Sequence, residues 1–504
     1  MKTTISTRSV LRHDFPRAAA ACVGVVLLCV SAQSATSQES VEQKIERLDG
    51  QMSRVQAQLE RSENELKEIQ QQLSALRSQA GLAPKNVPDD TAVSGAAQLA
   101  AAVDELREKQ DVLESQAAAQ EQSKVGSESR YPLTLSGMVL FNGFVNTHAV
   151  DVAPTPSMAL SGHGATGATL RQTVLGFDVS GPHLFGASSH ADLRMDFDGS
   201  ELTGSYANSI GFLRFRTAHA NLDWQHTNTF FSLDRPIISP DSPTSLTAVA
   251  EPALAWSGNL WAWNPQAGVS EELPIHRNAA LQMEAALIDV ADPFNPNANS
   301  SSLPVIPATT AEQSRWPGVE ARLSLLNPIN DSAAHLGVGG FFAPHRFAGG
   351  TTYNSWAGTM DFHLPIFAHL DLTGSAYRGQ ALGGLGGGTY KDYVYRIYLS
   401  EGYFRTLDDM GGWLQAKQRV NERLEFNEAI GIDNVPGYQL RPFAIPSLNN
   451  YYNLARNRTF TTNVIYRPSA YLLYSIEYRR IESSFVNSPT AWSDVIGIAA
   501  GYRF

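Results

Sequence analysis

The sequence contains only two cysteines in 504 residues, Cys22 and Cys29, and both lie in its first thirty residues. If that segment is a removable leader, the remaining chain has no thiol, which excludes disulfide scaffolds, cysteine-ligated zinc and thiol catalysis. Basic residues are also fewer than acidic ones: the sequence has 38 Lys and Arg and 49 Asp and Glu, which gives a net charge of −11. This balance argues against a nucleic-acid-binding surface.

Long hydrophobic runs are missing as well. The most apolar stretch, at 18–32, is too short for the roughly 20 residues that a membrane-spanning helix needs. It follows four basic residues and precedes small, polar ones, an arrangement typical of a cleaved secretory signal. We therefore predict that residues 1–34 are removed and that the mature chain is exported.

Catalytic and metal-binding motifs are a further absence. The sequence has no Gly-x-Ser-x-Gly elbow, no His-Glu-x-x-His pair and no phosphate-binding loop. His345 and His363 are isolated and are interpreted as wall residues, and the glycine run at 383–388 as a flexible extracellular loop. No enzyme activity, cofactor or metal site is predicted, although a hydrolase assembled from distant strands stays an alternative.

Residues 35–80 carry a heptad repeat. Apolar residues recur from Val41 to Leu76 in alternating steps of four and three, which is the 3.5-residue period of a coiled coil. Leucine-rich a positions with β-branched d positions favour three or more helices over two. We predict a trimeric coil; the alternative is a monomeric helix folded back on a second, weaker helix in the linker at 81–130.

From Tyr131 to the last residue the sequence alternates with period two. Sixteen extended segments are separated by Gly, Pro, Asn and Ser, near 133–148, 169–181, 188–199, 209–224, 227–234, 278–290, 316–326, 335–345, 353–364, 367–378, 391–400, 411–419, 422–433, 457–467, 471–483 and 492–504. An even number suits an outer-membrane barrel, but soluble sheets alternate too. The last segment favours the outer-membrane barrel over a soluble sheet. One face of it carries Ile496, Ile498, Ala500, Tyr502 and Phe504, as expected of lipid-facing residues beside an aromatic girdle. The predicted fold is an all-β transmembrane barrel of about sixteen antiparallel strands at 131–504, preceded by an α-helical coiled coil.

The signal, the heptads, the segment RQTVLGFDV at 171–179 and the terminal GYRF at 501–504 together resemble outer-membrane porins and, more narrowly, the DcaP-like porins. The resemblance implies a trimeric barrel in the outer membrane of a Gram-negative-type bacterium, with its coiled coil in the periplasm. It implies passage of small carboxylates and recognition of Tyr502 and Phe504 by the outer-membrane barrel assembly machinery. The expected partners are further copies of the chain, outer-membrane lipid, that machinery and small solutes, with peptidoglycan or periplasmic proteins at the coil.

Arginine dominates the basic residues of the barrel segment. Residues 131–504 hold 21 Arg and 2 Lys against 18 Asp and 13 Glu, and guanidinium groups bind carboxylates and phosphates bidentately. We predict that the pore is lined by Arg194, Arg214, Arg216, Arg322, Arg479, Asp192, Asp196 and Glu320. A basic ladder would favour anions, whereas net charge favours cations. In a third interpretation the arginines only stabilise the wall by pairing with Asp192, Asp196, Glu320, Asp361 and Glu477.

One long segment, 236–276, follows the fifth predicted strand and is a candidate constriction loop. It contains Asp241, Glu251, Trp256, Trp261 and Trp263. Its acids, with Glu271 and Glu272, would face the arginines and create a transverse field across the pore. The alternatives place the tryptophans at a trimer interface, in the outer girdle, or on a stacking track for sugars. A carbohydrate-selective or phosphate-selective porin therefore remains open, as does a structural barrel whose coil tethers the membrane to the cell wall.

Overall fold

The structure is a computed structural model that describes residues 124–125, 131–199, 211–276, 279–293, 308–327, 333–347, 350–398, 401–446 and 451–504. The predicted signal, the coiled coil and, apart from Lys124–Val125, the linker lie outside these ranges. Among the described residues, no helix is both long and apolar enough to cross a membrane.

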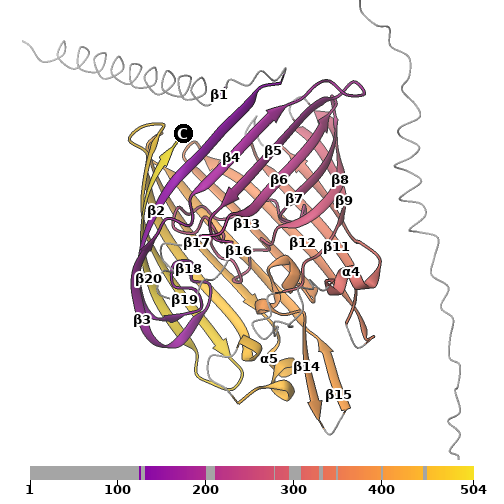
Figure 1. Ribbon diagram of the computed structural model, residues 1–504, viewed down its shortest axis with the longest axis vertical. Helices are drawn as coiled ribbons and strands as arrows, with labels where there is room; N and C mark the ends of the chain where they lie inside the picture. Colours follow the sequence, from indigo (N-terminus) through magenta and orange to yellow (C-terminus); the bar gives the residue numbers. More distant parts are fainter. Residues whose placement is uncertain are drawn as a thin grey trace, which may run out of the picture. The chain divides into compact units, whose positions relative to one another are not determined.

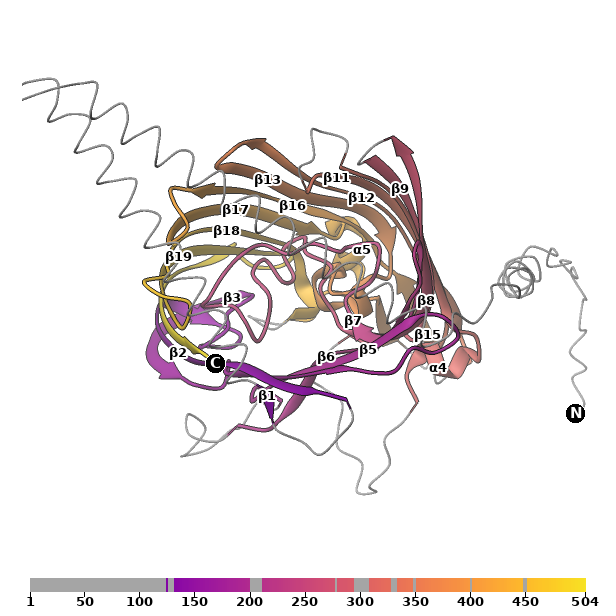
Figure 2. The same ribbon diagram turned by 90° about the horizontal axis from the view of Figure 1, so that it is seen from above.

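A closed antiparallel barrel makes up most of the described chain (Figures 1 and 2). Its strands are β2 (Leu133–Val150), β3 (Ala159–Thr169), β4 (Val174–Ser180), β5 (Ser188–Asp196), β6 (Arg214–Asp223), β7 (Thr227–Asp234), β8 (Asn264–His276), β9 (Ala279–Ile288), β10 (Gly318–Leu326), β11 (His335–Arg346), β12 (Thr352–Phe367), β13 (Leu370–Gln380), β16 (Asp408–Arg419), β17 (Leu424–Asn434), β18 (Leu454–Tyr466), β19 (Leu472–Phe485) and β20 (Ala491–Arg503). β20 pairs with β2 and closes the ring.

The predicted number of sixteen strands is confirmed. The sheet has 18 strands, of which β1 (Lys124–Val125) is a two-residue addition to β2. β3 and β4 pair with the two halves of β2 and together form one barrel strand. Sixteen strands therefore close the wall.

One of the sixteen predicted segments is wrong, and two strands of the wall, β3 and β8, were not predicted. Residues 264–276, assigned to the long loop, form β8 and pair with both β7 and β9. Residues 391–400, assigned to the wall, contribute β14 (Tyr393–Tyr398), which pairs with β15 (Glu401–Thr406) in a separate hairpin. The hairpin lies at the barrel end opposite the C-terminus (Figure 1). The short helices are α4 (Thr310–Ser314), η1 (Gly383–Leu385), η2 (Gly388–Tyr390), α5 (Gly437–Leu440), η3 (Arg441–Phe443) and η4 (Tyr451–Asn453).

Side chains alternate between the lumen and the outside along each strand. On β12, Trp356 and Met360 are exposed on the outer face, while Ser355, Thr359 and Asp361 are buried on the inner face. On β20 the predicted face is correct, because Ile496, Ile498 and Tyr502 are exposed outside the barrel. The pairing of β20 with β2 extends to the last residue, because the backbones of Phe504 and Gly137 exchange two hydrogen bonds of 3.0 and 3.1 Å.

One part of the outer face is polar. On β18 to β20, Arg458 and Arg480 both pair with Glu482, and Arg480 Nη1 also lies 3.0 Å from an oxygen of Asp494. The guanidinium of Arg480 stacks 4.6 Å from the ring of Trp492. Charged side chains on a lipid-facing surface are destabilising, so this patch differs in kind from the apolar outer face of β12.

Candidate functional site

A long loop, residues 235–263, connects β7 to β8 and folds into the barrel (Figure 2). We call it the lumenal loop. It is shorter than the predicted 236–276 because Asn264 to His276 form β8. It contains all five predicted loop residues, Asp241, Glu251, Trp256, Trp261 and Trp263.

Wall side chains hold the first half of the lumenal loop by hydrogen bonds to its backbone and side chains. Asn142 Nδ2 on β2 donates to the carbonyl of Leu246 over 2.8 Å, and Gln415 Oε1 on β16 accepts from the amide of Thr244 over 2.6 Å. Other wall residues that bond to this half are His335, Thr359, Asn463, Glu477 and Gln172. The loop thus contacts strands all round the lumen.

The second half of the loop crosses back against β16 to β18. Gly258 has φ +97°, and a Cβ there would lie 2.2 Å from the carbonyl oxygen of Gly412, so only glycine allows this approach. Beside it, Ser257 Oγ lies 2.8 Å from Thr459 Oγ1. Asn457 Nδ2 donates to the Trp256 carbonyl over 3.1 Å. Backbone and side-chain contacts together fix this half to the wall.

The three tryptophans pack inside the barrel. Trp256 is stacked on Tyr390, with ring centroids 4.1 Å apart, and its edge meets Trp261 at 6.0 Å. Trp263 lies 5.5 Å from Trp261 and under the guanidinium groups of Arg214 and Arg216. The interpretation that these residues belong to the outer girdle or to a trimer contact is therefore wrong.

The glycine run at 383–388 is buried rather than flexible and solvent-exposed, which corrects the prediction from sequence. It belongs to the glycine loop, residues 381–392, which packs against the lumenal loop. Gly386, with φ +96°, lies where a Cβ would come 2.8 Å from Trp261. Lys391, only 2% exposed, donates to the carbonyls of Thr389 and Leu454 over 2.7 and 2.9 Å. Burial lowers the pKa of Lys391 to about 7.

Arginines on β5 and β6 form the most accessible basic group among the predicted lumen residues. Arg214 and Arg216 approach one carboxylate, that of Asp196, at 2.8 and 3.5 Å. The two guanidinium side chains are 29% and 17% exposed, whereas the Asp196 side chain is fully buried. Arg194 pairs with Asp178 at 2.6 Å and lies 3.9 Å from Asp192. At Arg214 and Arg216 the surface therefore presents guanidinium groups above a buried carboxylate, whereas at Arg194 the partner Asp178 is as accessible as the arginine.

Arg322 and Arg479 are buried in ion pairs instead. Arg322 binds Glu284 and Asp361, each at 2.7 Å, and its side chain is 5% exposed. Arg479 pairs with Glu477 at 2.6 Å and is 7% exposed. The interpretation that arginines stabilise the wall describes these two residues well. The expected partner Glu320 is also buried, but it makes no ion pair within the described chain.

The acids of the lumenal loop do not form an open anionic surface. Burial raises the pKa of Glu251 to about 8, which favours the neutral form of this side chain compared with an ordinary carboxyl group. Asp241 binds His335 at 3.0 Å. Glu271 and Glu272 lie on β8, outside the loop, and Glu271 accepts a hydrogen bond from Thr227. A strong transverse field from these acids is therefore not expected.

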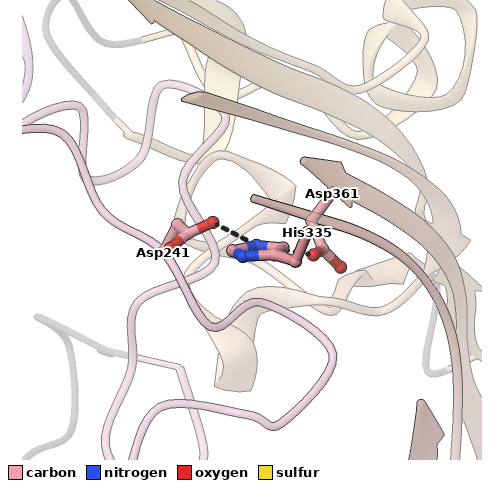
Figure 3. A group of neighbouring side chains, drawn as sticks. All are labelled: Asp241, His335 and Asp361. Carbon is pink, nitrogen blue, oxygen red and sulfur yellow. Dashed lines mark hydrogen bonds and ion pairs between the residues drawn. The ribbon is translucent and has the colours of Figure 1, made fainter. Parts of the chain in front are cut away.

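Two histidines that the sequence analysis did not single out occupy polar clusters in the barrel. His219 on β6 lies between Asp192 and Asp234, with one carboxylate on each ring nitrogen. His335 on β11 lies between Asp241 and Asp361 (Figure 3). Asp241, His335 and Asp361 form the group in the described chain whose donor atoms are spaced to hold a metal ion. Their wide separation in sequence leaves no local motif.

Comparisons with known proteins bear on the fold. No protein-family model matches the sequence, and no curated protein matches it. Among solved structures, the outer-membrane channel DcaP of Acinetobacter baumannii is similar with a TM-score of 0.55 and 14% identity, over 76% of this chain and 100% of that chain. An anion-selective porin from Comamonas acidovorans has a TM-score of 0.46 and 10% identity, over 74% and 100%. The likeness to DcaP confirms the porin barrel fold and the resemblance inferred from the sequence.

Proposed function

We propose that the protein is an outer-membrane porin through which small hydrophilic anions, chiefly carboxylates, diffuse passively. The observation that carries this proposal is the pair Arg214 and Arg216 over Asp196. Two guanidinium groups share one fully buried carboxylate, so the lumenal surface there has an excess positive charge. Guanidinium groups suit carboxylate recognition because they offer paired donors in one plane.

Two features support anion selectivity over the alternative functions. Burial raises the pKa of Glu251, which weakens one opposing charge of the loop. Trp256 is 8% exposed and stacked on Tyr390, so it offers no free face to a sugar ring and a stacking track for carbohydrates is disfavoured. A phosphate-selective channel would share the anion preference, and a comparison of chloride, acetate and phosphate currents separates the two.

We further propose that the channel is a homotrimer in the outer membrane, with the coil at 35–80 in the periplasm and Tyr502 and Phe504 as the assembly signal. The polar outer patch of Arg458, Arg480 and Glu482 supports a subunit contact. These residues lie near the ends of β18 to β20, where a charged side chain against lipid costs less than at the bilayer midplane but is still unfavourable, and a neighbouring copy would replace lipid there. The patch holds both charge signs, so it offers ion-pair partners to the different surface that a neighbouring subunit presents in a three-fold contact.

The test is planar-bilayer conductance of the purified full chain under a KCl gradient. We expect three correlated conductance steps and a reversal potential that indicates anion preference. Arg216→Ala should reduce the anion-to-cation permeability ratio, because a unit charge about 4 Å from an ion in water contributes roughly 1 kcal/mol, or about fivefold. Arg214 remains in this variant to pair with Asp196.

Arg378→Ala is the matched control, because Arg378 points away from the lumen and is half exposed. Its reversal potential should equal that of the wild type. An unchanged reversal potential in Arg216→Ala would exclude this arginine from the ion path. A correctly folded barrel without any conductance would favour the structural anchor over the channel.

A further inference from the structure

Three metal-ligating side chains meet where the lumenal loop contacts the wall (Figure 3). Asp241 comes from the loop, His335 from the start of β11 and Asp361 from β12. The Nε2 atom of His335 lies 3.0 Å from Oδ2 of Asp241 and 3.4 Å from Oδ2 of Asp361. One donor atom of each residue lies within 4.8 Å of the other two.

The two carboxylates approach the same ring nitrogen of His335. A ring nitrogen carries at most one hydrogen, so a single N–H would be shared between two acceptors. His219 differs, because Asp192 lies 3.1 Å from its Nδ1 and Asp234 lies 3.0 Å from its Nε2. There, a doubly protonated ring gives each carboxylate its own donor. Convergence on one nitrogen instead suits a cation placed between all three donor atoms.

We propose that Asp241, His335 and Asp361 bind a divalent transition-metal ion of the zinc type. Zinc bonds of about 2.0–2.2 Å in tetrahedral geometry place neighbouring ligand atoms roughly 3.3–3.5 Å apart. The two distances from His335, 3.0 and 3.4 Å, are close to this spacing. The carboxylates of Asp241, Asp361 and Glu284 together balance the charges of the ion and of Arg322, and a neutral imidazole supplies the third bond. Water would complete the coordination.

The surroundings of the cluster orient its donors. Arg322 donates from Nε and Nη2 to the two oxygens of Asp361 over 3.1 and 2.7 Å, and each oxygen keeps a further lone pair for a metal. Such outer partners hold ligands in place and strengthen metal sites. The side chains of His335 and Asp241 are 18% and 23% exposed, so an ion in the aqueous lumen can reach them.

A bound ion would join the lumenal loop to β11 and β12 by coordinate bonds. If the protein conducts as proposed above, the metal-loaded channel should have a steadier and smaller single-channel current than the metal-free channel. This consequence rests on the proposed function, whereas the binding itself does not.

Binding is tested on the full chain in detergent after treatment with a chelator. Isothermal titration with Zn²⁺ gives affinity and stoichiometry, and Co²⁺ reports a tetrahedral site through its visible absorption. We expect one zinc ion per chain, with affinity at least about tenfold weaker in His335→Gln and in Asp241→Asn. His219→Gln is the matched control, since His219 also lies between two aspartates, and it should bind zinc like the wild type.

The possible outcomes separate the proposals. A wild-type protein that binds no zinc, or a His335→Gln variant with unchanged affinity, would refute the metal site and leave an imidazolium ion pair. An equal loss in His219→Gln would point to non-specific binding and refute it too. Zinc binding by a barrel that carries no current would leave the metal site standing and reject the channel.

Discussion

Replacing Arg322 by alanine tests how the wall beneath the lumenal loop is stabilised. The Arg322 guanidinium makes four hydrogen bonds: two to Asp361, one to Glu284 over 2.7 Å and one to Ser324 over 3.3 Å. The side chain is 5% exposed, and the Asp361 side chain is fully buried. Arg322→Ala would leave two carboxylates close together with no cation from that position.

Removing one partner of a buried ion pair typically costs about 3–5 kcal/mol, because the remaining charge stays desolvated. We expect the free energy of unfolding of Arg322→Ala to fall by that amount. The reversal potential should change much less than in Arg216→Ala. The sequence analysis counted Arg322 as a pore-lining residue; the structure instead places it in a buried pair, where its first effect is on stability.

The assay is urea unfolding with reversible refolding into phospholipid vesicles, followed by tryptophan fluorescence. The midpoint and the slope together give the free energy. Arg378→Ala serves as the control, because Arg378 is half exposed and pairs with Asp408 only at 3.6 Å. Such a pair contributes less than about 1 kcal/mol. A loss this small in Arg322→Ala would mean that water reaches the carboxylates, and would refute our reasoning.

Two further predictions concern the loops inside the barrel. Trp256→Ala removes the ring stacked 4.1 Å from Tyr390 and leaves a cavity worth about 3–5 kcal/mol, so single-channel currents should become larger and noisier; currents identical to the wild type would show that the loops stay in place without this contact. Burial raises the pKa of Glu251 from 4.5 to about 8, so the folded state binds the proton more tightly and the free energy of unfolding should fall as pH rises from about 4.5 to 8. In Glu251→Gln this contribution should vanish, and urea unfolding at a series of pH values would contradict the assignment if both proteins had the same slope.

The strand number was predictable, but the assignments of β3, β8 and β14 were not. Residues 264–276 contain Pro265, Gly268 and Pro274, which weaken a strand signal. They form β8 because β7 and β9 supply hydrogen-bond partners on both sides. Residues 391–400 alternate well, yet β14 finds only β15 as a partner. Alternation predicts an extended segment, whereas membership of the wall depends on partners distant in sequence.

The candidate site, too, was only partly predictable from the sequence. The prediction that Arg194, Arg322 and Arg479 line the pore does not tell which carboxylate each one meets. Glu284 as a partner of Arg322 emerges only from the pairing of β9 with β10. The metal-binding cluster was missed because Asp241 and His335 are 94 residues apart. No spacing rule connects them without the register of the barrel.

The wall contacts of the lumenal loop also have a consequence for the order of assembly. Ser245 bonds to Glu477, 232 residues further along the chain, and Asn142 to Leu246 across 104 residues. Contacts between such distant residues close long loops of chain and therefore form slowly. Since β18 to β20 complete the ring, the loop can reach its final position only when the last strands are in place. A lumenal loop that is bonded to both the first and the last strands therefore indicates a completed barrel.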